Sequence, residues 1–230
     1  STQISDGVKC YLRDIGKIEV SEIKPGYIGF KDKWGVIWGA PKSVKSPLYY
    51  DIIESPLSDF KEKDLDYYDW PKPPSTDQLK ALRKYAEGIK QKGDYALVSG
   101  VYGSIWEISL ALRGFEQFFM DLVINPSFAH KLLDIVTQNW LTYGEIFFSE
   151  LSEFFDVIHA GDDLGTQKGP MISIKMFREF LKPRYKLIYD FIHSKTKAKV
   201  FYHGCGSMTS FLPDLINIGV EALNPVQTSA

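Results

Sequence analysis

Two side chains with metal-binding chemistry follow a short apolar stretch late in the chain. Residues 200–202 read as a buried strand, and His203 and Cys205 come directly after it, two positions apart. Side chains two apart on an extended chain point to the same side, so the imidazole and the thiol should leave the strand end together. Both groups are ligands that zinc prefers. The pair therefore indicates a metal site, and the alternative is a strand-end histidine beside an inert buried cysteine.

A complete zinc site needs more than this pair. Catalytic zinc has three protein ligands and structural zinc has four, so two ligands alone predict weak binding or none. The nearest candidates for a third ligand, by their place in the predicted topology, are Asp163 and Glu221.

Asp162 and Asp163 follow another apolar stretch and are the predicted catalytic residues. A carboxylate at the end of a strand can act as a general acid or base, or can hold a substrate cation. An acidic side chain ahead of a turn equally often accepts hydrogen bonds from the amides of that turn. The sequence leaves both roles open for the two residues.

Four further side chains are predicted to contact substrate because they stand at strand ends. They are Tyr102, Gln167, Asn224 and Gln227. For Tyr102 the alternative is an aromatic residue that covers the core, and for Asn224 and Gln227 it is a purely local role in a turn.

Apolar strands alternate with helices along the second part of the chain. This order predicts right-handed βα units, an α/β fold and neighbouring parallel strands. The predicted strands cover residues 95–101, 155–160, 200–202 and 222–226, and the predicted helices cover 77–91, 105–112, 115–124, 127–151, 174–194 (with a bend at Pro183) and 208–218. All four strands end in small or polar residues, which is typical of the mouth of a β/α barrel. A doubly wound sheet is the alternative, although no Gly-x-Gly-x-x-Gly motif follows a strand.

The positions of the predicted strands and helices also predict the domain organisation. Residues 1–75 are irregular, with short strands expected at 27–30 and 35–38, and we expect them to form an N-terminal extension that packs on the barrel. A (β/α)8 barrel takes roughly 250 residues. Residues 76–230 supply four βα units, so we expect them to be about the first half of a barrel whose remainder is missing beyond Ala230.

Composition excludes several classes of protein. The 230 residues are 44% hydrophobic and 24% charged with a net charge of −2, and no basic patch indicates nucleic-acid binding. No apolar run reaches the roughly 18 residues that a membrane span requires, and residues 1–6 do not resemble a signal peptide. Cys10 and Cys205 lie far apart in sequence, which argues against a disulfide framework and favours a cytoplasmic location.

Several ordered motifs resemble the uroporphyrinogen decarboxylase superfamily. The similar segments are residues 34–38, 112–116, 161–170, 177–183, 202–206 and 219–227. The resemblance implies a (β/α)8 barrel with its cleft at the carboxyl ends of the strands. It also implies one of two chemistries, which are the cofactor-free decarboxylation of uroporphyrinogen and zinc-dependent methyl transfer with a corrinoid protein.

The methyltransferase branch carries a His-x-Cys pair, which His203 and Cys205 match. Its distant second cysteine has no match here, because Cys10 precedes the pair, so the third ligand is expected in the missing part. The Arg-Gln-Ala-Gly-Arg stretch of the decarboxylases is also absent. The resemblance therefore favours a zinc-dependent methyltransferase, with a decarboxylase or a non-catalytic relative as alternatives. The partners it implies are a small-molecule methyl donor or acceptor, a corrinoid protein and, as one option, a second copy of the chain in a homodimer.

Overall fold

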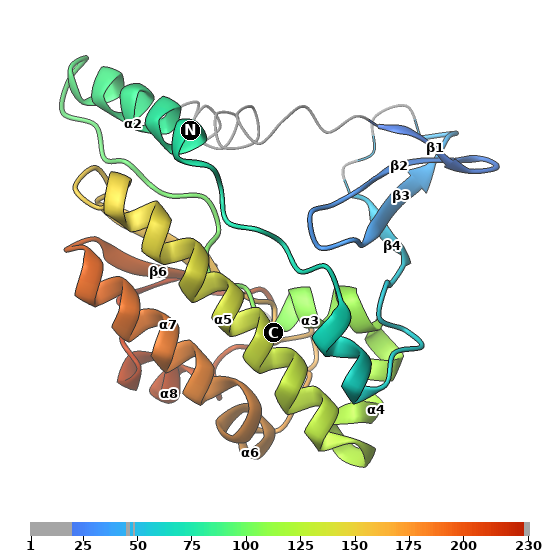
Figure 1. Cartoon of the computed structure of the whole chain (residues 1–230). Coiled ribbons are helices and arrows are strands. Elements are labelled where there is room, and N and C mark those ends of the chain that lie inside the picture. Colours follow the sequence, from blue (N-terminus) through green and yellow to red (C-terminus); the bar gives the residue numbers. More distant parts are fainter. Residues whose placement is uncertain (1–19, 45–46, 48, 228–230) are drawn as a thin grey trace.

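Two separate β-sheets and the helices around them make up residues 20–44, 47 and 49–227, the part of the chain that the computed structural model describes (Figure 1). Cys10 and residues 1–6 lie outside this part, so the expectations that rest on them stay untested. The strands are β1 (Ser21–Lys24), β2 (Tyr27–Lys31), β3 (Ile37–Pro41), β4 (Asp51–Glu54), β5 (Val157–Gly161), β6 (Lys199–His203) and β7 (Ala222–Asn224).

The second sheet has the order β5-β6-β7, and both strand pairs are parallel. Along β5 and β6 every second side chain is fully buried, as for Ile158 and Val200, and the residues between them are only half-buried. One face of the sheet therefore packs on helices, as expected for strands with a period of two. The predicted parallel arrangement of these three strands is confirmed, whereas the complete barrel stays a prediction.

The strand predicted over 95–101 is present only in part. It runs parallel to β5 through two isolated bridges, Val98 to Val157 and Tyr102 to Ala160. Between them, side chains replace ladder bonds: the Ser99 hydroxyl accepts the His159 N–H at 3.0 Å, and near the start of the segment the Asp156 carboxylate accepts the Leu97 N–H at 2.8 Å. β7 is likewise shorter than predicted, because Pro225 has no N–H with which to continue the ladder.

The predicted helices are confirmed with small shifts at their ends. They are α2 (Thr76–Lys90), α3 (Trp106–Arg113), α4 (Phe115–Ile124), α5 (Pro126–Leu151), the consecutive α6 (Ile174–Met176), η2 (Phe177–Leu181) and α7 (Lys182–Lys195), and α8 (Leu212–Asn217). A further short helix, η1 (Glu62–Tyr67), lies in the region predicted to be irregular. The helix predicted over 208–218 begins late, at Leu212, because Pro213 favours the first turn of a helix. Within the described ranges, none of these helices is both long and apolar enough to cross a membrane.

The bend expected at Pro183 takes the form of a wider turn. The five residues of η2 are a π-helix that joins α6 to α7, and Pro183 stands in the first turn of α7. Proline has no N–H to donate to the carbonyl four residues earlier, so the helical hydrogen-bond ladder is interrupted at this point. A π-type turn keeps the helix continuous across the interruption.

The N-terminal region holds an antiparallel sheet of β1 to β4 in sequence order, which extends the two predicted strands. The turn between β2 and β3 is organised by Asp32. Its carboxylate accepts the N–H groups of Trp34 and Val36 and the indole N–H of Trp38, at 2.8 to 3.0 Å. Trp34 is 5% exposed and its ring lies 6.4 Å from that of Trp140 on α5, so this turn packs on the helices.

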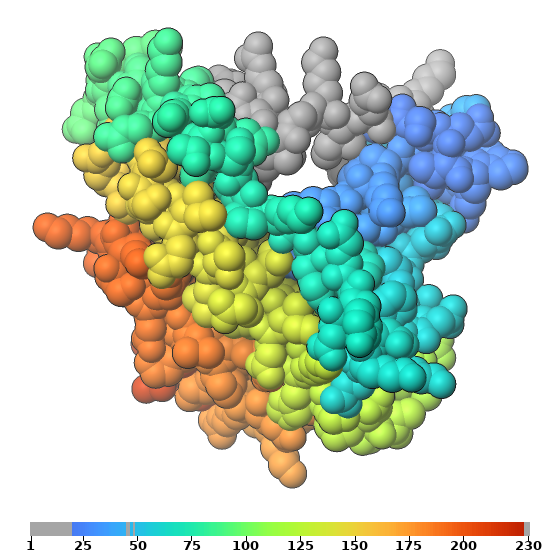
Figure 2. All heavy atoms as spheres, viewed as in Figure 1, coloured from blue at the N-terminus to red at the C-terminus, as the bar shows by residue number. Residues whose placement is uncertain are grey.

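Helix η1 and the segment that leads from it to α2 lie along α5 (Figure 1). Figure 2 shows them as a teal band that runs beside the yellow-green atoms of α5. Three contacts hold them there: Ser127 donates to Glu62, Lys131 to Asp66, and the Asn139 amide to the Pro71 carbonyl, at 2.6 to 2.9 Å.

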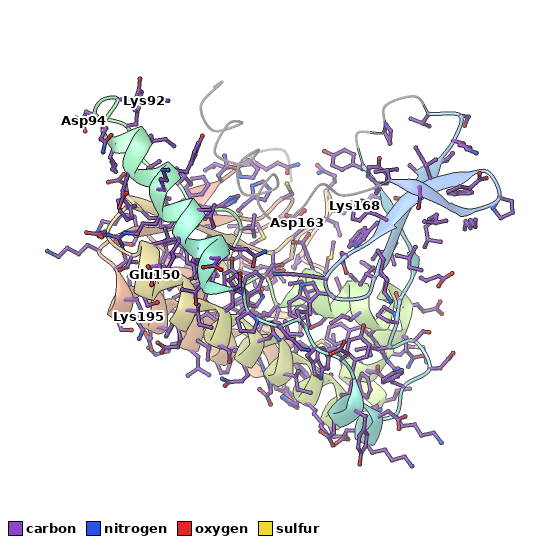
Figure 3. The ribbon with its side chains drawn as sticks, turned by 45° about the horizontal axis from the view of Figure 1, so that its top comes forward. Lys92, Asp94, Glu150, Asp163, Lys168 and Lys195 are labelled. Atoms are coloured by element: carbon purple, nitrogen blue, oxygen red, sulfur yellow. The ribbon has the colours of Figure 1, made fainter. Side chains whose placement is uncertain are left out.

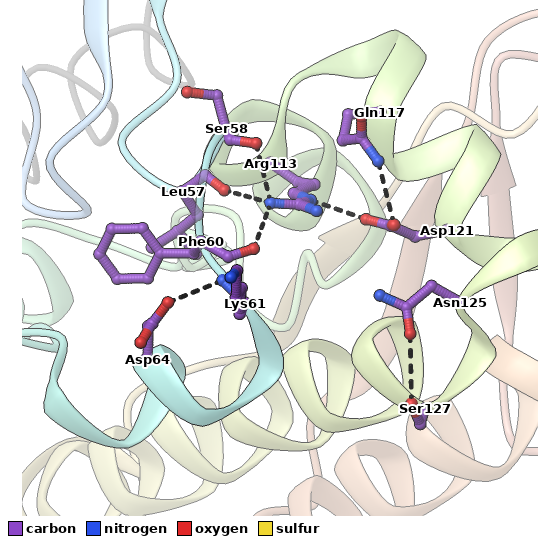
Figure 4. A network of polar contacts seen from close by, with 10 residues as sticks. All are labelled: Leu57, Ser58, Phe60, Lys61, Asp64, Arg113, Gln117, Asp121, Asn125 and Ser127. Carbon is purple, nitrogen blue, oxygen red and sulfur yellow. Dashed lines mark hydrogen bonds and ion pairs between the residues drawn. The ribbon is translucent and has the colours of Figure 1, made fainter.

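Arg113, at the end of α3, joins this N-terminal region to the helices (Figure 4). The guanidinium donates to Asp121 at 2.7 Å and to the carbonyl oxygens of Leu57, Ser58 and Phe60 at 2.5 to 2.9 Å. Both Arg113 and Asp121 are almost fully buried. A buried charge pair is stable only when its remaining donors and acceptors are satisfied, which the three carbonyls achieve here.

Replacing Arg113 by Met should therefore lower the free energy of unfolding by about 3–5 kcal/mol, because Asp121 would remain buried and unpaired. Urea unfolding followed by circular dichroism measures the loss. The matched control is Lys186→Met, which breaks an exposed pair with Asp190 on α7 and should cost about 0.3–0.5 kcal/mol. Equal losses in the two variants would show that the Arg113 network does not hold the N-terminal segment.

Candidate metal centre

Asp163, His203 and Cys205 gather at the carboxyl end of the parallel sheet. His203 is the last residue of β6 and pairs in register with Gly161, the last residue of β5. Cys205 follows His203 by two residues and Asp163 follows Gly161 by two. One ligand atom from each of the three side chains lies within 4.8 Å of the other two, and all three residues are half-buried. The chain thus brings together the predicted pair and a third group that is distant in sequence.

The spacing of these atoms suits a small metal ion. The Sγ atom of Cys205 lies 3.4 Å from Nε2 of His203, and Nε2 lies 4.0 Å from Oδ1 of Asp163. A sulfur at about 2.3 Å and a nitrogen at about 2.0–2.1 Å from a tetrahedral zinc ion stand about 3.6 Å apart. Thiolate, imidazole and carboxylate are all zinc ligands. The three residues therefore fit zinc in both donor type and spacing.

Neighbouring groups orient these side chains. Nδ1 of His203 lies 3.0 Å from Oδ1 of Asn224, so a proton on Nδ1 leaves Nε2 facing Cys205 and Asp163. Oδ1 of Asp163 accepts the backbone N–H of Cys205 at 2.7 Å. Asn224 therefore acts through the histidine, in the manner of the groups that support metal-binding imidazoles in other proteins.

Burial raises the pKa of the Cys205 thiol, and the charge of Asp163 together with its hydrogen bond to the thiol raises that pKa further. In the metal-free protein the sulfur therefore carries its proton at neutral pH. A thiol beside a carboxylate is a poor nucleophile, since only the thiolate reacts. A bound cation reverses this balance, because a thiol that coordinates a metal is deprotonated.

Asp162 is placed differently from its neighbour. It is 1% exposed, and its two oxygens accept hydrogen bonds from the hydroxyls of Ser104 and Tyr185. They also accept the backbone N–H groups of residues 105, 106 and 107, which open α3. These N–H groups would otherwise have no partner, and a carboxylate is favoured at a helix N-terminus. The geometry gives Asp162 a structural role and does not support the catalytic role predicted for it.

Tyr102 also lies away from the cleft. It is 3% exposed, its hydroxyl donates to the Trp140 carbonyl at 2.6 Å, and its ring packs on Trp140 and Phe148. The prediction that Tyr102 binds substrate is corrected to the alternative, an aromatic residue of the core. The reason is that its bridge to Ala160 turns the ring toward α5, where several aromatic rings cover it.

Gln167 and Gln227 do lie beside the candidate centre. The Gln227 carboxamide accepts the Gly206 N–H at 2.9 Å and donates to Gln167 at 2.6 Å. Together with Asn224, they join the loops that follow β5, β6 and β7. Glu221, the other candidate for a third ligand, instead pairs with Lys199 and His193.

Two groups near the centre carry little signal in the sequence. His159 on β5 is half-buried, and its ring lies 6.1 Å from that of His203. Its Nε2 atom is buried and has no hydrogen-bond partner among the described residues. Glu107 donates its backbone N–H to Asp162. Burial of the Glu107 side chain, and to a lesser extent the charges of Asp162 and Asp163, raise its pKa to about 8. Residue type and spacing alone could not bring these side chains to the centre.

Figure 3 shows the position of the centre in the molecule. Asp163 and Lys168 lie on the side of the N-terminal sheet, far from Lys92 and Asp94 at the tip of α2. The residues therefore define an α/β protein with a polar cluster at the carboxyl edge of its parallel sheet, the edge where such folds place their binding sites.

The model of the uroporphyrinogen decarboxylase (URO-D) family matches residues 52–227. The chain therefore belongs to this family, as its ordered motifs indicated.

The fold is also similar to that of a solved structure, a methyltransferase from Methanosarcina mazei. The TM-score is 0.55 at 18% sequence identity, with 94% of this chain and 54% of that chain covered. The chain thus spans about half the length of that methyltransferase, and at this identity the likeness concerns the fold alone.

The state of the Cys205 thiol gives a test of the centre in metal-free protein. In a Cys10→Ser background, alkylation by iodoacetamide should be slow at pH 7. Its rate should still rise above pH 8.5, about the ordinary pKa of a free thiol, because the folded pKa is raised. Asp163→Asn removes the charge that raises this pKa, so alkylation at pH 8 should become several-fold faster. Asp94→Asn, remote from the centre, should change nothing. Equal rates in all three proteins would contradict the proximity of Asp163 to the thiol.

Proposed function

We propose that this chain acts in zinc-dependent methyl transfer between a small molecule and a corrinoid protein, with Asp163, His203 and Cys205 as the metal ligands. The observation that carries the proposal is the spacing of these three donors at the carboxyl ends of β5 and β6. Membership of the URO-D family and the fold likeness to a methyltransferase support it.

Zinc held by these residues would supply a Lewis acid, which lowers the pKa of a bound thiol or polarises an ether oxygen. The residues around it have separate tasks. Asn224 fixes the ring of His203 through Nδ1, and Asp163 fixes the backbone at Cys205. Gln167 and Gln227 hold the loops together and offer amide groups to a substrate at the rim.

A cofactor-free decarboxylase has less support. It would need a carboxylate free to face the pyrrole N–H groups of its substrate. Both oxygens of Asp162 are already occupied by donors from Ser104, Tyr185 and α3, which leaves Asp163 alone for this purpose. A non-catalytic relative remains an outcome of the experiment below.

The same proposal extends to the architecture and the setting of the protein. We place residues 76–230 as about the first half of a (β/α)8 barrel and residues 1–75 as an extension that packs on it. The parallel order of β5, β6 and β7 and the burial of Trp34 against α5 support this placement. A cytoplasmic location and a homodimer belong to the proposal as well.

Metal analysis after dialysis against a mild chelator tests the centre. The unaltered chain should keep one zinc ion, and His203→Ala and Cys205→Ser should each lose it, because two ligands do not hold a dication firmly. Asn224→Ala should weaken zinc binding about 10–100-fold, the usual effect of removing a group that orients a ligand. The control is His193→Ala, an exposed histidine on α7.

Methyl transfer is measured on the same proteins, as the loss of methylcobalamin in the presence of a small thiol. Cys205→Ser should remove zinc and methyl transfer together, whereas His193→Ala should keep both. A chain that holds no zinc and yet decarboxylates uroporphyrinogen would overturn the proposal in favour of the decarboxylase. A chain that neither holds zinc nor catalyses either reaction would favour the non-catalytic relative.

A further inference from the structure

A cavity of about 200 Å³ separates the N-terminal sheet from α3. The sheet side contributes Asp32, Trp34 and Trp38, and α3 contributes Glu107 and Ile108. Sites for drug-sized ligands are roughly 300–1,000 Å³. The cavity therefore suits a smaller molecule.

The titratable residues in the cavity lining are all of the acidic type. Two of the lining residues, Asp32 and Glu107, are acidic, and none is basic. The Asp32 carboxylate accepts the backbone N–H groups of Trp34 and Val36 and the indole N–H of Trp38, so it is fixed in place. The nearest cation on the same turn, Lys33, does not line the cavity.

One ring of the cavity lining, that of Trp34, already attracts a cation from the chain itself, together with two rings outside the lining. The Lys33 ammonium lies 5.8 Å from the Trp34 ring and 5.2 Å from the rings of Trp140 and Tyr143. A cation within about 6 Å of an aromatic face is attracted by the negative face of the ring, most strongly by tryptophan. Trp34 and Trp38 both line the cavity, beside the carboxyl groups of Asp32 and Glu107.

We propose that this cavity binds a small organic cation, an alkylated ammonium group that is packed against the two tryptophans and faces Asp32 and Glu107. Its methyl or methylene groups would contact Trp34, Trp38 and Ile108. An anion would be repelled by the Asp32 carboxylate, and a neutral molecule would lack the attraction that this carboxylate and the tryptophan rings exert on a cation. Aromatic rings that face the cation are the usual means by which proteins recognise quaternary ammonium ligands.

The cavity adjoins the candidate metal centre. Glu107 lines the cavity, and its N–H donates to Asp162, the residue before Asp163. Burial and the charges of Asp162 and Asp163 raise the pKa of Glu107 to about 8, so its carboxyl group is protonated at neutral pH and becomes charged above pH 8 or when a bound cation displaces the proton. The inference rests on the proposed function, because it names the class of substrate on which the adjoining metal centre would act. That substrate is a molecule with an alkylated ammonium group.

Binding is tested by isothermal titration of the full chain with choline and with 3,3-dimethylbutan-1-ol, its neutral isostere, in which carbon replaces the charged nitrogen. Choline should bind at least tenfold more tightly than the alcohol, a difference of about 1.4 kcal/mol. Between pH 7 and pH 9 the affinity for choline should rise several-fold as Glu107 loses its proton, and Glu107→Gln should abolish this rise and leave the affinity for the alcohol unchanged. Trp38→Leu should weaken both ligands, and Trp38→Phe should restore part of the affinity for choline.

Two controls keep the result interpretable. Glu116→Gln removes an exposed carboxylate at the start of α4, outside the cavity, and should leave choline binding unchanged. Circular dichroism shows whether each variant is folded. The inference is overturned if choline shows no saturable binding, if choline and the alcohol bind equally, if 3,3-dimethylbutyrate binds more tightly than choline, or if folded Glu107→Gln binds choline at pH 9 as tightly as the unaltered chain does.

The choline titration and the zinc measurement give separate results for this inference and for the proposed function. Titration is carried out without zinc and corrinoid, and zinc content is measured on its own. Loss of choline binding with zinc intact overturns only the substrate class. Absence of zinc with choline binding intact overturns the metal centre and leaves the cation site standing.

Discussion

The carboxyl edge of the parallel sheet depends on one buried carboxylate. Asp162 follows β5, and its side chain accepts three N–H groups at the start of α3 together with the hydroxyls of Ser104 and Tyr185. Its backbone carbonyl accepts the hydroxyl of Tyr202 from β6. A buried anion is tolerated only when donors replace the lost water, and here those donors come from a helix start and two neighbouring elements. The cost of leaving any of these groups unpaired fixes the relative positions of β5, β6, α3 and α7.

Two adjacent carboxylates thus have opposite environments. Asp162 turns inward and is fully hydrogen-bonded, whereas Asp163 turns outward, is half-buried and stands beside His203 and Cys205. Because the inner residue is rigidly held, the outer one has a defined position without being buried. Such support from groups that do not touch a ligand is what keeps a metal-binding constellation within a few tenths of an ångström of useful geometry.

The N-terminal sheet contributes to the same side of the molecule. Asp32 orders the turn between β2 and β3, Trp34 packs against Trp140, and the buried Arg113 fastens the chain that leads from this sheet into η1. These contacts bring tryptophans and a carboxylate next to α3, beside the centre. A region that looks irregular in sequence therefore forms one wall of the cavity.

The sequence by itself determined the order of strands and helices, the parallel pairing of the sheet and the placement of His203 and Cys205 on one side of a strand end. These follow from periodicity, capping residues and the i, i+2 geometry of an extended chain, all of which act over a few residues. Only the tertiary structure decided which of two neighbouring aspartates is buried, that Asp163 rather than Glu221 joins the pair, and that Tyr102 faces the core. These outcomes depend on contacts between residues tens of positions apart, such as Tyr185 with Asp162 and Lys199 with Glu221. Local sequence carries no record of such contacts, because they arise only when the packed elements compete for the same donors and acceptors.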